Sequence, residues 1–321
     1  MEVNVHRLKG TAMRVGTKLA SAALGVALLV TVSACGGGAN ADGTPAADAS
    51  SAADTVPQVE PDPEAVKLLP ADLQQGGTIT MAADLNYPPT SFLAEDNTTP
   101  VGYNVDIAHL LGEKLGLTVN IENVSFDSVI PGIQGGRYDF TATNMSPTAD
   151  RLKVLDMITY WSAGSSLAVS PGNPENLSLA DQSICGRNIA VTSGSTQAEK
   201  YLPEITGDCE SAGQPAVAAV VLPNVQAALT QLDSKRVDGV FYDTSSLAWA
   251  AKQQPQAFEL LSPQYKKKQG DNIVALGLAK DSPLTPALHA AMQSLIDGPA
   301  YQAALDSWNL GAGAIPTAEV K

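Results

Sequence analysis

Residues that follow two predicted β-strands have the chemistry of an anion-binding site. Arg151 follows one strand, and its guanidinium can grip a carboxylate through two parallel hydrogen bonds. Gly194, Ser195 and Thr196 follow the other strand and open a predicted helix. The N-terminus of a helix offers free N–H groups and a positive dipole end to the same carboxylate. These residues predict a site for a ligand carboxylate.

Three further residues would complete a site for a zwitterion. Asp243 ends the sequence Val-Phe-Tyr-Asp and can balance an ammonium group. Tyr87 and Phe126 can hold a ligand side chain between their apolar faces. A carboxylate clamp, an ammonium acceptor and an aromatic slot together predict an α-amino acid as the ligand.

Each of these features has a more ordinary interpretation when it is taken alone. An arginine near a strand end is more often part of a surface ion pair, and a Gly-Ser-Thr turn is usually only a helix cap. Asp243 could cap the helix that follows it, and the Tyr-Pro-Pro sequence at 87–89 could be just a rigid turn. The binding interpretation depends on their joint occurrence, each at the carboxyl end of a different strand.

The hydrophobic periodicity predicts two units in which strands and helices alternate. The first unit has its elements at 79–81, 105–115, 119–124, 129–134 and 138–143. The second has them at 188–192, 196–201, 220–222, 224–232 and 237–242, with Asn224 as a helix N-cap. A strand at 273–278 and two helices within 284–308 follow. This order favours open α/β sheets and two similar lobes.

The N-terminal segment has the order of a secretory signal, which we expect at residues 1–34. Its basic residues Arg7, Lys9, Arg14 and Lys18 precede an uncharged apolar run. The ending Val-Ser-Ala-Cys resembles the lipobox of bacterial lipoproteins, which makes Cys35 the expected lipid anchor. An ordinary signal peptide with a chance cysteine is the alternative. From Cys35 to residue 75 we expect a disordered acidic linker, because the segment has little apolar surface to bury.

The composition argues against several classes of function. The 321 residues include 33 acidic and 19 basic ones, and this chain lacks the basic surface that nucleic acids need. With only three His and three Cys, neither a metal site nor a cofactor is expected. Cys185 and Cys209 would lie outside the cytoplasm, where disulfides persist, so we expect a bridge between them. Two unpaired buried thiols are the alternative.

Seven stretches of the sequence together resemble the bacterial extracellular solute-binding proteins of family 3, which bind polar amino acids for ABC importers. They are ADLNYPPTSF (83–92), VGYNVDIAHLLGEKLGL (101–117), FDSVIPGIQGGRYDF (126–140), NMSPTADR (144–151), CGRNIAVTSGSTQ (185–197), KRVDGVFYD (235–243) and YQAALDSWNLGAGAI (301–315). The resemblance implies an α/β fold of the periplasmic-binding-protein type 2, with two lobes that close on a ligand. The implied ranges are 76–160 plus 275–315 for lobe 1, 166–269 for lobe 2, and 161–165 and 270–274 for two hinge crossovers.

Carried over position by position, the resemblance implies ligand-binding roles for ten residues. Asp84 would meet polar groups of the ligand side chain, and Tyr87 and Phe126 would stack on it. The α-amino and carboxylate groups would be bound by Thr143, Asn144, Ser146, Arg151, Ser195, Thr196 and Asp243. Two departures from the family pattern concern the pocket. Thr90 stands where a second aromatic residue is usual, and Asn144 stands where Gly or Ser is common.

The sequence therefore predicts a lipid-anchored substrate-binding protein at the outer face of the cytoplasmic membrane. It would be a monomer without enzymatic activity that delivers a polar amino acid to the permease subunits of an ABC transporter. Asp84 suits a side chain with donors, such as Gln, Arg, Lys or His. The alternatives are a ligand-sensing regulatory protein and a dehydratase-type enzyme on the same fold. His109 and His289 lie on predicted helices away from the cleft, and no nucleophile–base pair is visible.

Overall fold

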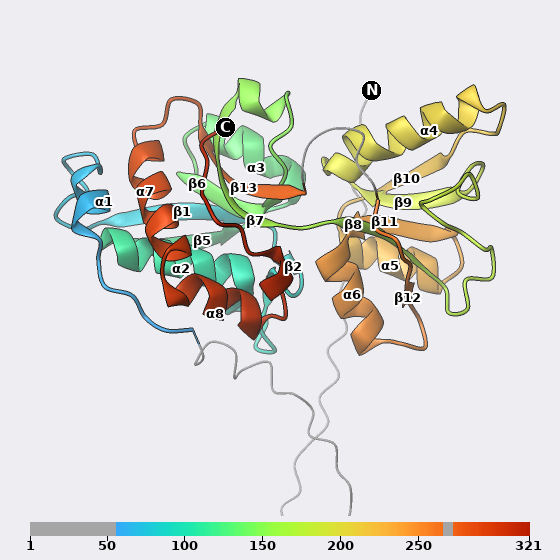
Figure 1. Ribbon diagram of the computed structural model, residues 1–321, viewed down its shortest axis with the longest axis horizontal. Coiled ribbons are helices and arrows are strands. Elements are labelled where there is room, and N and C mark those ends of the chain that lie inside the picture. Colours follow the sequence, from blue (N-terminus) through green and yellow to red (C-terminus); the bar gives the residue numbers. More distant parts are fainter. Residues whose placement is uncertain (1–55, 266–271) are drawn as a thin grey trace, which may run out of the picture. The chain divides into compact units, whose positions relative to one another are not determined.

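Two five-stranded sheets organise the described part of the chain (Figure 1). The structure is a computed structural model, and it describes residues 56–265 and 272–321. The strand order is β5-β1-β6-β13-β7 in the first sheet and β10-β9-β11-β8-β12 in the second. We call the part of the chain built on the first sheet lobe 1 and the part built on the second sheet lobe 2. The predicted two-lobed α/β fold is confirmed.

Lobe 1 combines parallel and antiparallel strands. Its sheet consists of β1 (Thr78–Ala83), β5 (Thr118–Asn123), β6 (Phe140–Met145), β7 (Leu155–Ser162) and β13 (Ile273–Ala279). Strand β1 pairs in parallel with β5 and β6, whereas β13 pairs antiparallel with β6 and β7. Its larger helices are α2 (Tyr103–Leu115), α3 (Phe126–Gln134), α7 (Thr285–Ile296) and α8 (Pro299–Ser307). Helix α2 buries the predicted stripe of Ile107, Leu111 and Leu115.

Lobe 2 repeats this arrangement. Its sheet consists of β8 (Ser165–Val169), β9 (Asn188–Thr192), β10 (Ala218–Leu222), β11 (Gly239–Asp243) and β12 (Glu259–Leu260). Strand β9 pairs in parallel with β10 and β11, and β8 pairs antiparallel with β11 and β12. Its helices are α4 (Leu202–Ser211), α5 (Val225–Asp233) and α6 (Thr244–Gln253). Asn224 caps α5 as predicted, because its side chain accepts a hydrogen bond from the Ala227 N–H over 2.9 Å.

The chain passes between the lobes twice. The first passage lies between the end of β7 and the start of β8, and the second lies between β12 and β13. The two passages run side by side where the Ala163 N–H donates to the Asn272 carbonyl over 2.7 Å. Two connections that lie side by side between lobes suit a hinge. The residue ranges of the two lobes and of their crossovers stay predictions.

A small sheet after β1 brings an aromatic side chain to the other lobe. It consists of β2 (Asn86–Tyr87), β3 (Ser91–Leu93) and β4 (Pro100–Val101). The ring of Phe92 in β3 lies 5.6 Å from that of Trp308 in lobe 1 and 6.0 Å from that of Trp249 in α6 of lobe 2. Aromatic pairs at such centroid distances attract each other. Phe92 therefore joins the two lobes through aromatic contacts.

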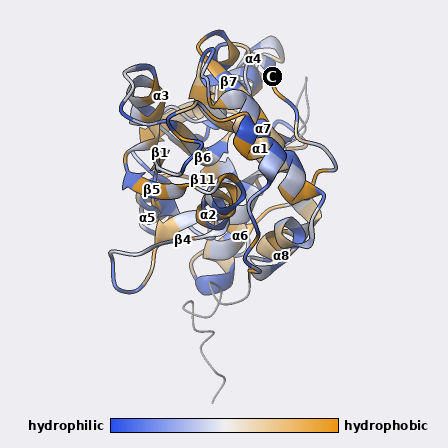
Figure 2. Ribbon diagram, turned by 90° about the vertical axis from the view of Figure 1, so that its left-hand side faces the viewer, coloured by the Kyte–Doolittle hydropathy of each residue, from blue (hydrophilic) through white to orange (hydrophobic). Residues whose placement is uncertain are grey.

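Helix α1 (Pro63–Lys67) corrects the prediction of a linker that extends to residue 75. The side chain of Asp62 caps this helix by accepting from the Glu64 N–H over 2.9 Å, and Ala65 is fully buried. Leu69 is buried as well, and α1 packs against α7 (Figure 2). These few apolar residues bury enough surface against lobe 1 to order the segment, so the linker prediction is wrong over residues 56–75.

The predicted signal, Cys35 and the rest of the linker lie outside the described residues. Within residues 56–265 and 272–321, the helices are all too short or too polar to cross a membrane.

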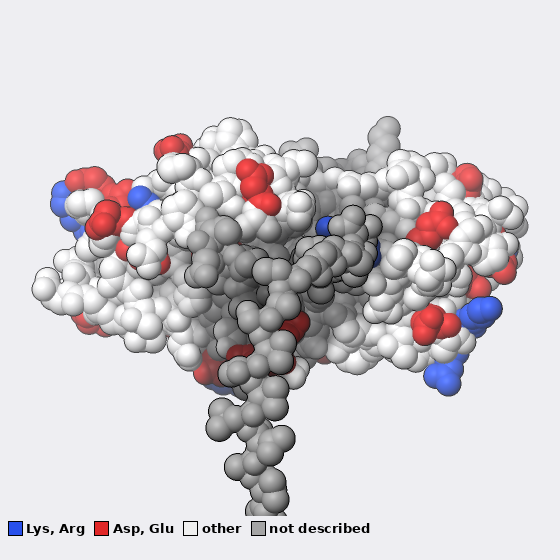
Figure 3. All heavy atoms as spheres, turned by 90° about the horizontal axis from the view of Figure 1, so that it is seen from below, with Lys and Arg blue, Asp and Glu red and all other residues white. Residues whose placement is uncertain are grey.

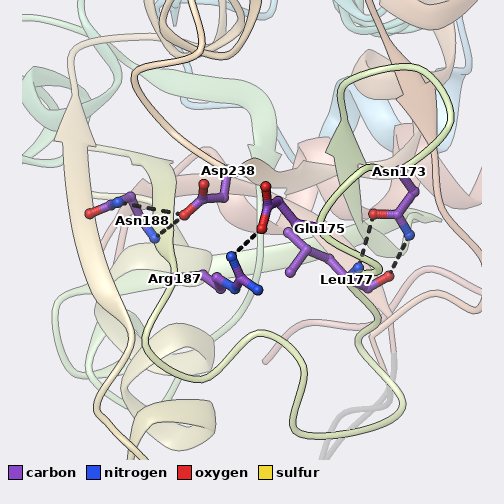
Figure 4. Close-up of polar contacts among 6 residues, drawn as sticks. All are labelled: Asn173, Glu175, Leu177, Arg187, Asn188 and Asp238. Carbon is purple, nitrogen blue, oxygen red and sulfur yellow. Dashed lines mark hydrogen bonds and ion pairs between the residues drawn. The ribbon is translucent and has the colours of Figure 1, made fainter.

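The long connection between β8 and β9 is held by polar contacts and by the predicted disulfide. Cys185 and Cys209 are bonded, with their Cα atoms 5.7 Å apart, which confirms the bridge. Figure 4 shows the polar contacts of this connection. Asn173 forms two hydrogen bonds of 2.9 Å with the backbone of Leu177, and Arg187 pairs with Glu175. The polar contacts thus join residues within the connection, and the disulfide attaches it to α4.

Candidate functional site

The predicted site residues come from strand ends of both lobes. In lobe 1 they follow β1, lie at the end of β6 or directly after it, or belong to the short 3-10 turn η2 (Arg151–Lys153): Asp84, Tyr87, Thr143, Asn144, Ser146 and Arg151. Phe126 opens α3 of the same lobe. In lobe 2 they follow β9 or end β11: Ser195, Thr196 and Asp243. The order of the elements explains this arrangement, because the carboxyl ends of parallel strands meet at one edge of a sheet.

Arg151 bonds to both lobes and is only 5% exposed. Its Nη1 donates to the Ser146 carbonyl over 3.0 Å and to the Thr196 hydroxyl over 3.1 Å. Its Nη2 donates to the Gly194 carbonyl over 2.8 Å. These bonds use three of the five N–H groups of a guanidinium. The interpretation of Arg151 as part of a surface ion pair is therefore wrong.

The charge of Arg151 persists in spite of its burial. Removal from water lowers the pKa of Arg151 from its ordinary value, but a guanidinium stays protonated in proteins. Its central carbon lies 5.7 Å from the centre of the Phe126 ring, within the range of a cation–π contact. Arg151, Phe126 and Thr196 line a cavity of about 450 Å³ between the lobes. A buried positive charge beside a cavity can bind an anionic group. Asp84, Tyr87 and Asp243 are not among the residues that line this cavity.

The turn after β9 presents backbone groups to Arg151. Gly194 has a φ of +70°, a conformation that most side chains disfavour, and its carbonyl points to the guanidinium. The Ser195 hydroxyl accepts from the Ala198 N–H over 3.2 Å, which is the ordinary capping role. Thr196 uses its hydroxyl to bond Arg151 across the cleft. The turn thus combines a helix cap with contacts to the other lobe.

The two predicted acids lie in different surroundings. Asp84 is 1% exposed and accepts from the Phe126 N–H over 3.0 Å and from the Asn86 side chain over 2.7 Å. Burial raises the pKa of Asp84, although both hydrogen bonds favour its ionised form. Asp243 is partly buried and accepts from the Gln197 amide over 2.8 Å. Asp243 occupies the N-cap position of α6, but its side chain makes no capping hydrogen bond.

The rings of Tyr87 and Phe126, which were predicted to hold a ligand side chain between their faces, do not lie parallel to each other. The rings of Tyr87 and Phe126 are 6.5 Å apart and nearly perpendicular, at 83°. A third ring, that of Tyr242 in lobe 2, stacks on Tyr87 at 5.4 Å and 19°. Tyr242 immediately precedes Asp243 in β11, and this place in the strand was the only sequence signal for it. The site therefore has three aromatic residues, contributed by both lobes.

The two departures from the family pattern contact each other. The side-chain amide of Asn144 donates to the Thr90 hydroxyl over 2.9 Å, and its oxygen accepts from Asn104 over 3.1 Å. Asn144 has a φ of +55°, a conformation that asparagine tolerates better than most residues. Thr143 is buried, with its hydroxyl 3.2 Å from that of Thr141. A polar network thus occupies the space that a larger ring would fill at position 90.

A closed circle of contacts connects most of these residues across the two lobes. In order, they are Arg151, Phe126, Tyr87, Tyr242, Asp243, Gln197 and Thr196. Two of these links, Tyr242 to Asp243 and Gln197 to Thr196, are between neighbours in the chain. Asp84 joins the circle through the backbone of Phe126. Gln197 was not among the predicted residues, since a side-chain bond to a distant strand leaves no local pattern in the sequence. The circle contains two carboxylates and one guanidinium.

The remaining candidates for chemistry lie elsewhere. In the described ranges, His, Cys, Asp and Glu form no group of three that could hold a metal ion. His289 contacts the Ala318 carbonyl over 3.1 Å in lobe 1, and His109 is exposed on α2. In the described ranges, neither histidine belongs to the circle of contacts.

Comparison with known proteins identifies a family and several relatives. The model of the bacterial extracellular solute-binding proteins, family 3, matches residues 79–311. The arginine-binding protein ArgT of Corynebacterium glutamicum is 26% identical over 268 residues, which cover 81% of this chain and 84% of that protein. The ABC transporter arginine-binding protein 1 of Escherichia coli is 26% identical over 237 residues, covering 72% and 90%.

A solved structure resembles the chain to a similar degree. It is an ancestral arginine-binding protein bound to arginine, with a TM-score of 0.64 and 26% sequence identity. The match covers 72% of this chain and 98% of that one. The range matched by the family model extends through both lobes.

Proposed function

The chain belongs to the bacterial extracellular solute-binding proteins, family 3, and we propose that the amino acid it captures for an ABC importer is L-arginine. The members of this family are solute-binding proteins. The chain is accordingly the substrate-binding component of an amino-acid ABC transporter, located outside the cytoplasm. The choice of arginine depends on the charges of the site.

The single observation that supports arginine is the balance of charges in the circle of contacts. Asp84 and Asp243 supply two negative charges, and Arg151 supplies one positive charge. A buried charge is costly unless it is paired. A ligand with one carboxylate and two cationic groups would give each of the three charges a partner of opposite charge, whereas a neutral amino acid would bring no cationic group to Asp84. L-arginine has this set of charges, and the relatives described above are arginine-binding proteins.

Each residue then has a role in the proposed complex. The ligand carboxylate binds Arg151 and the turn of Ser195 and Thr196, and the ammonium binds Asp243. Thr143, Asn144 and Ser146 supply further hydrogen bonds to these two groups. The guanidinium of the ligand lies near Asp84, flanked by the aromatic faces of Tyr87, Phe126 and Tyr242, which attract cations. The lobes close through the crossovers at 161–165 and 270–274.

We also propose that the protein is attached to the membrane by a lipid. Lipidation at Cys35, after removal of residues 1–34, would tether a monomer to the outer face of the cytoplasmic membrane. The acidic segment from Cys35 to residue 55 would be the tether, followed by lobe 1 at 76–160 plus 275–315 and lobe 2 at 166–269. The permease subunits would receive the arginine when the lobes open.

A thermal-shift screen of the purified protein tests this proposal. The twenty amino acids are added one at a time, together with L-ornithine and L-citrulline. A ligand at one hundred times its dissociation constant stabilises the folded state by about 2.7 kcal/mol. We expect the largest rise in melting temperature with L-arginine. A larger rise with L-glutamate or L-glutamine than with L-arginine would contradict it.

A further inference from the structure

Gln197 is a buried amide that contacts the proposed ammonium acceptor. It is 4% exposed, and its Nε2 donates to the Asp243 carboxylate over 2.8 Å and to the Ser165 hydroxyl over 2.8 Å. A carboxylate only accepts hydrogen bonds, so the amide nitrogen must be the atom that faces Asp243. Both hydrogens of that nitrogen are thereby used within lobe 2.

An unusual turn of the backbone points Gln197 inward. Residues Gln197–Tyr201 form a π-helical turn (η3) that leads into α4. Such turns are rare and occur often at functional sites, because the extra residue in the turn redirects a side chain. Gln197 and Tyr201, at the two ends of η3, are both buried. The π-turn is thus the local feature that places the amide beside the end of β11.

The same amide connects Asp243 to the start of lobe 2. Ser165 is the first residue of β8, directly after the passage from lobe 1. Asp243 and Ser165 are paired residues of the antiparallel strands β11 and β8. Gln197 therefore spans this strand pair and fixes the orientation of the Asp243 carboxylate relative to the crossover. Because an amide is neutral, it does so without cancelling the negative charge.

We propose that Gln197 is a positioning residue, which holds the Asp243 carboxylate in the orientation that receives the ammonium group of the ligand. This inference rests on the proposed function, in which Asp243 binds that ammonium. It makes a specific prediction: loss of the Gln197 amide weakens the binding of ligands that have an α-amino group and leaves the binding of ligands without one unchanged.

Isothermal titration calorimetry with two ligands tests the role of Gln197. They are L-arginine and 5-guanidinopentanoate, which is arginine without the α-amino group. Hydrogen bonds to charged groups contribute about 1.5 kcal/mol or more, which is a factor of about 10 in affinity. We expect Gln197→Met, an uncharged replacement of similar length, to weaken arginine binding about tenfold. Binding of 5-guanidinopentanoate should change less than about twofold.

Three further variants complete the test of Gln197. Gln214→Ala changes an exposed glutamine of the same lobe and should alter neither affinity. Gln197→Ala serves in place of Gln197→Met if the methionine variant does not unfold cooperatively at a temperature near that of the wild type. In an Asp243→Asn background, removal of the Gln197 amide should have no further effect on arginine binding.

The outcomes separate the two proposals. Equal weakening of both ligands by Gln197→Met, or no weakening of arginine binding, would overturn the positioning role. A wild-type protein that does not bind L-arginine would instead overturn the proposed function, and the positioning role with it. An additive effect of Gln197→Met and Asp243→Asn would show that the amide does not act through Asp243.

Discussion

At the scale of single residues, Arg151 contacts lobe 2 and, in the proposed complex, would also bind the ligand. Its bonds to Gly194 and Thr196 cross the cleft, and its bond to Ser146 stays in lobe 1. In the proposed complex the same guanidinium also receives the ligand carboxylate. Arg151 would therefore couple ligand binding to closure of the lobes, since it contacts the ligand and lobe 2 together.

Replacement of Arg151 by alanine should weaken the binding of L-arginine at least tenfold, because a charged hydrogen bond contributes about 1.5 kcal/mol or more. Calorimetry would measure the change. Arg151→Lys keeps the charge but loses the planar fork, so we expect an intermediate affinity. Agmatine, which is arginine without its carboxylate, should lose less affinity than L-arginine does in Arg151→Ala. An affinity for L-arginine that stays within about threefold in Arg151→Ala would show that the carboxylate binds elsewhere.

The sequence alone points to candidate site residues at strand ends, and their ligand-binding roles stay predictions. Arg151 and the turn at 194–196 have chemistry that is recognisable without the structure, and they contact each other across the cleft. Asp243 is recognisable in the same way, and it bonds Gln197 within lobe 2. Tyr242 and Gln197 were missed, because their importance comes from contacts with residues far away in the sequence. The bond between Thr90 and Asn144 was missed for the same reason, although each had been noted as unusual.

At the scale of helices and strands, most elements were predictable from periodicity and caps. The apolar stripe of α2 and the Asn224 cap of α5 are local features, which a sequence displays directly. Helix α1 was not predictable, because its few apolar residues are spread among prolines and acids, and its order depends on packing against α7. The π-turn η3 was also not predictable, since no residue type specifies one.

The disulfide between Cys185 and Cys209 links α4 to the connection before β9, and its removal should destabilise lobe 2. On the loop-entropy model, a bridge across 24 residues contributes about 3 kcal/mol. We expect the double variant Cys185→Ser, Cys209→Ser to melt at least about 6 °C below the wild type, as measured by circular dichroism. Reductant should lower the melting temperature of the wild type only. Equal melting temperatures of the two proteins would mean that the bridge does not stabilise the fold.

At the scale of the whole binding unit, side-chain contacts connect the two lobes across the cleft. They include contacts of Arg151 with the 194–196 turn, of Tyr87 with Tyr242 and of Phe92 with Trp249. In the proposed complex, the contacts of Arg151 with lobe 2 and with the ligand carboxylate would both favour the closed form.

The charge of the chain acts on a longer range than these contacts. The full sequence has a net charge of −14, and Figure 3 shows acidic side chains dispersed over one face. A negative surface raises the local concentration of cations and lowers that of anions. This field favours the approach of a cationic amino acid, in agreement with the excess of one carboxylate in the site.

The central claim, that the site selects a cationic amino acid, is tested most directly by the affinities of L-arginine and L-citrulline measured by calorimetry on the same protein. Citrulline has nearly the same shape but an uncharged side chain, so the ratio of affinities reports the charge alone. We predict that L-arginine binds at least about tenfold more tightly, since one charge-assisted hydrogen bond contributes about that factor. Citrulline binding as tight as arginine binding, or tighter, would contradict the claim.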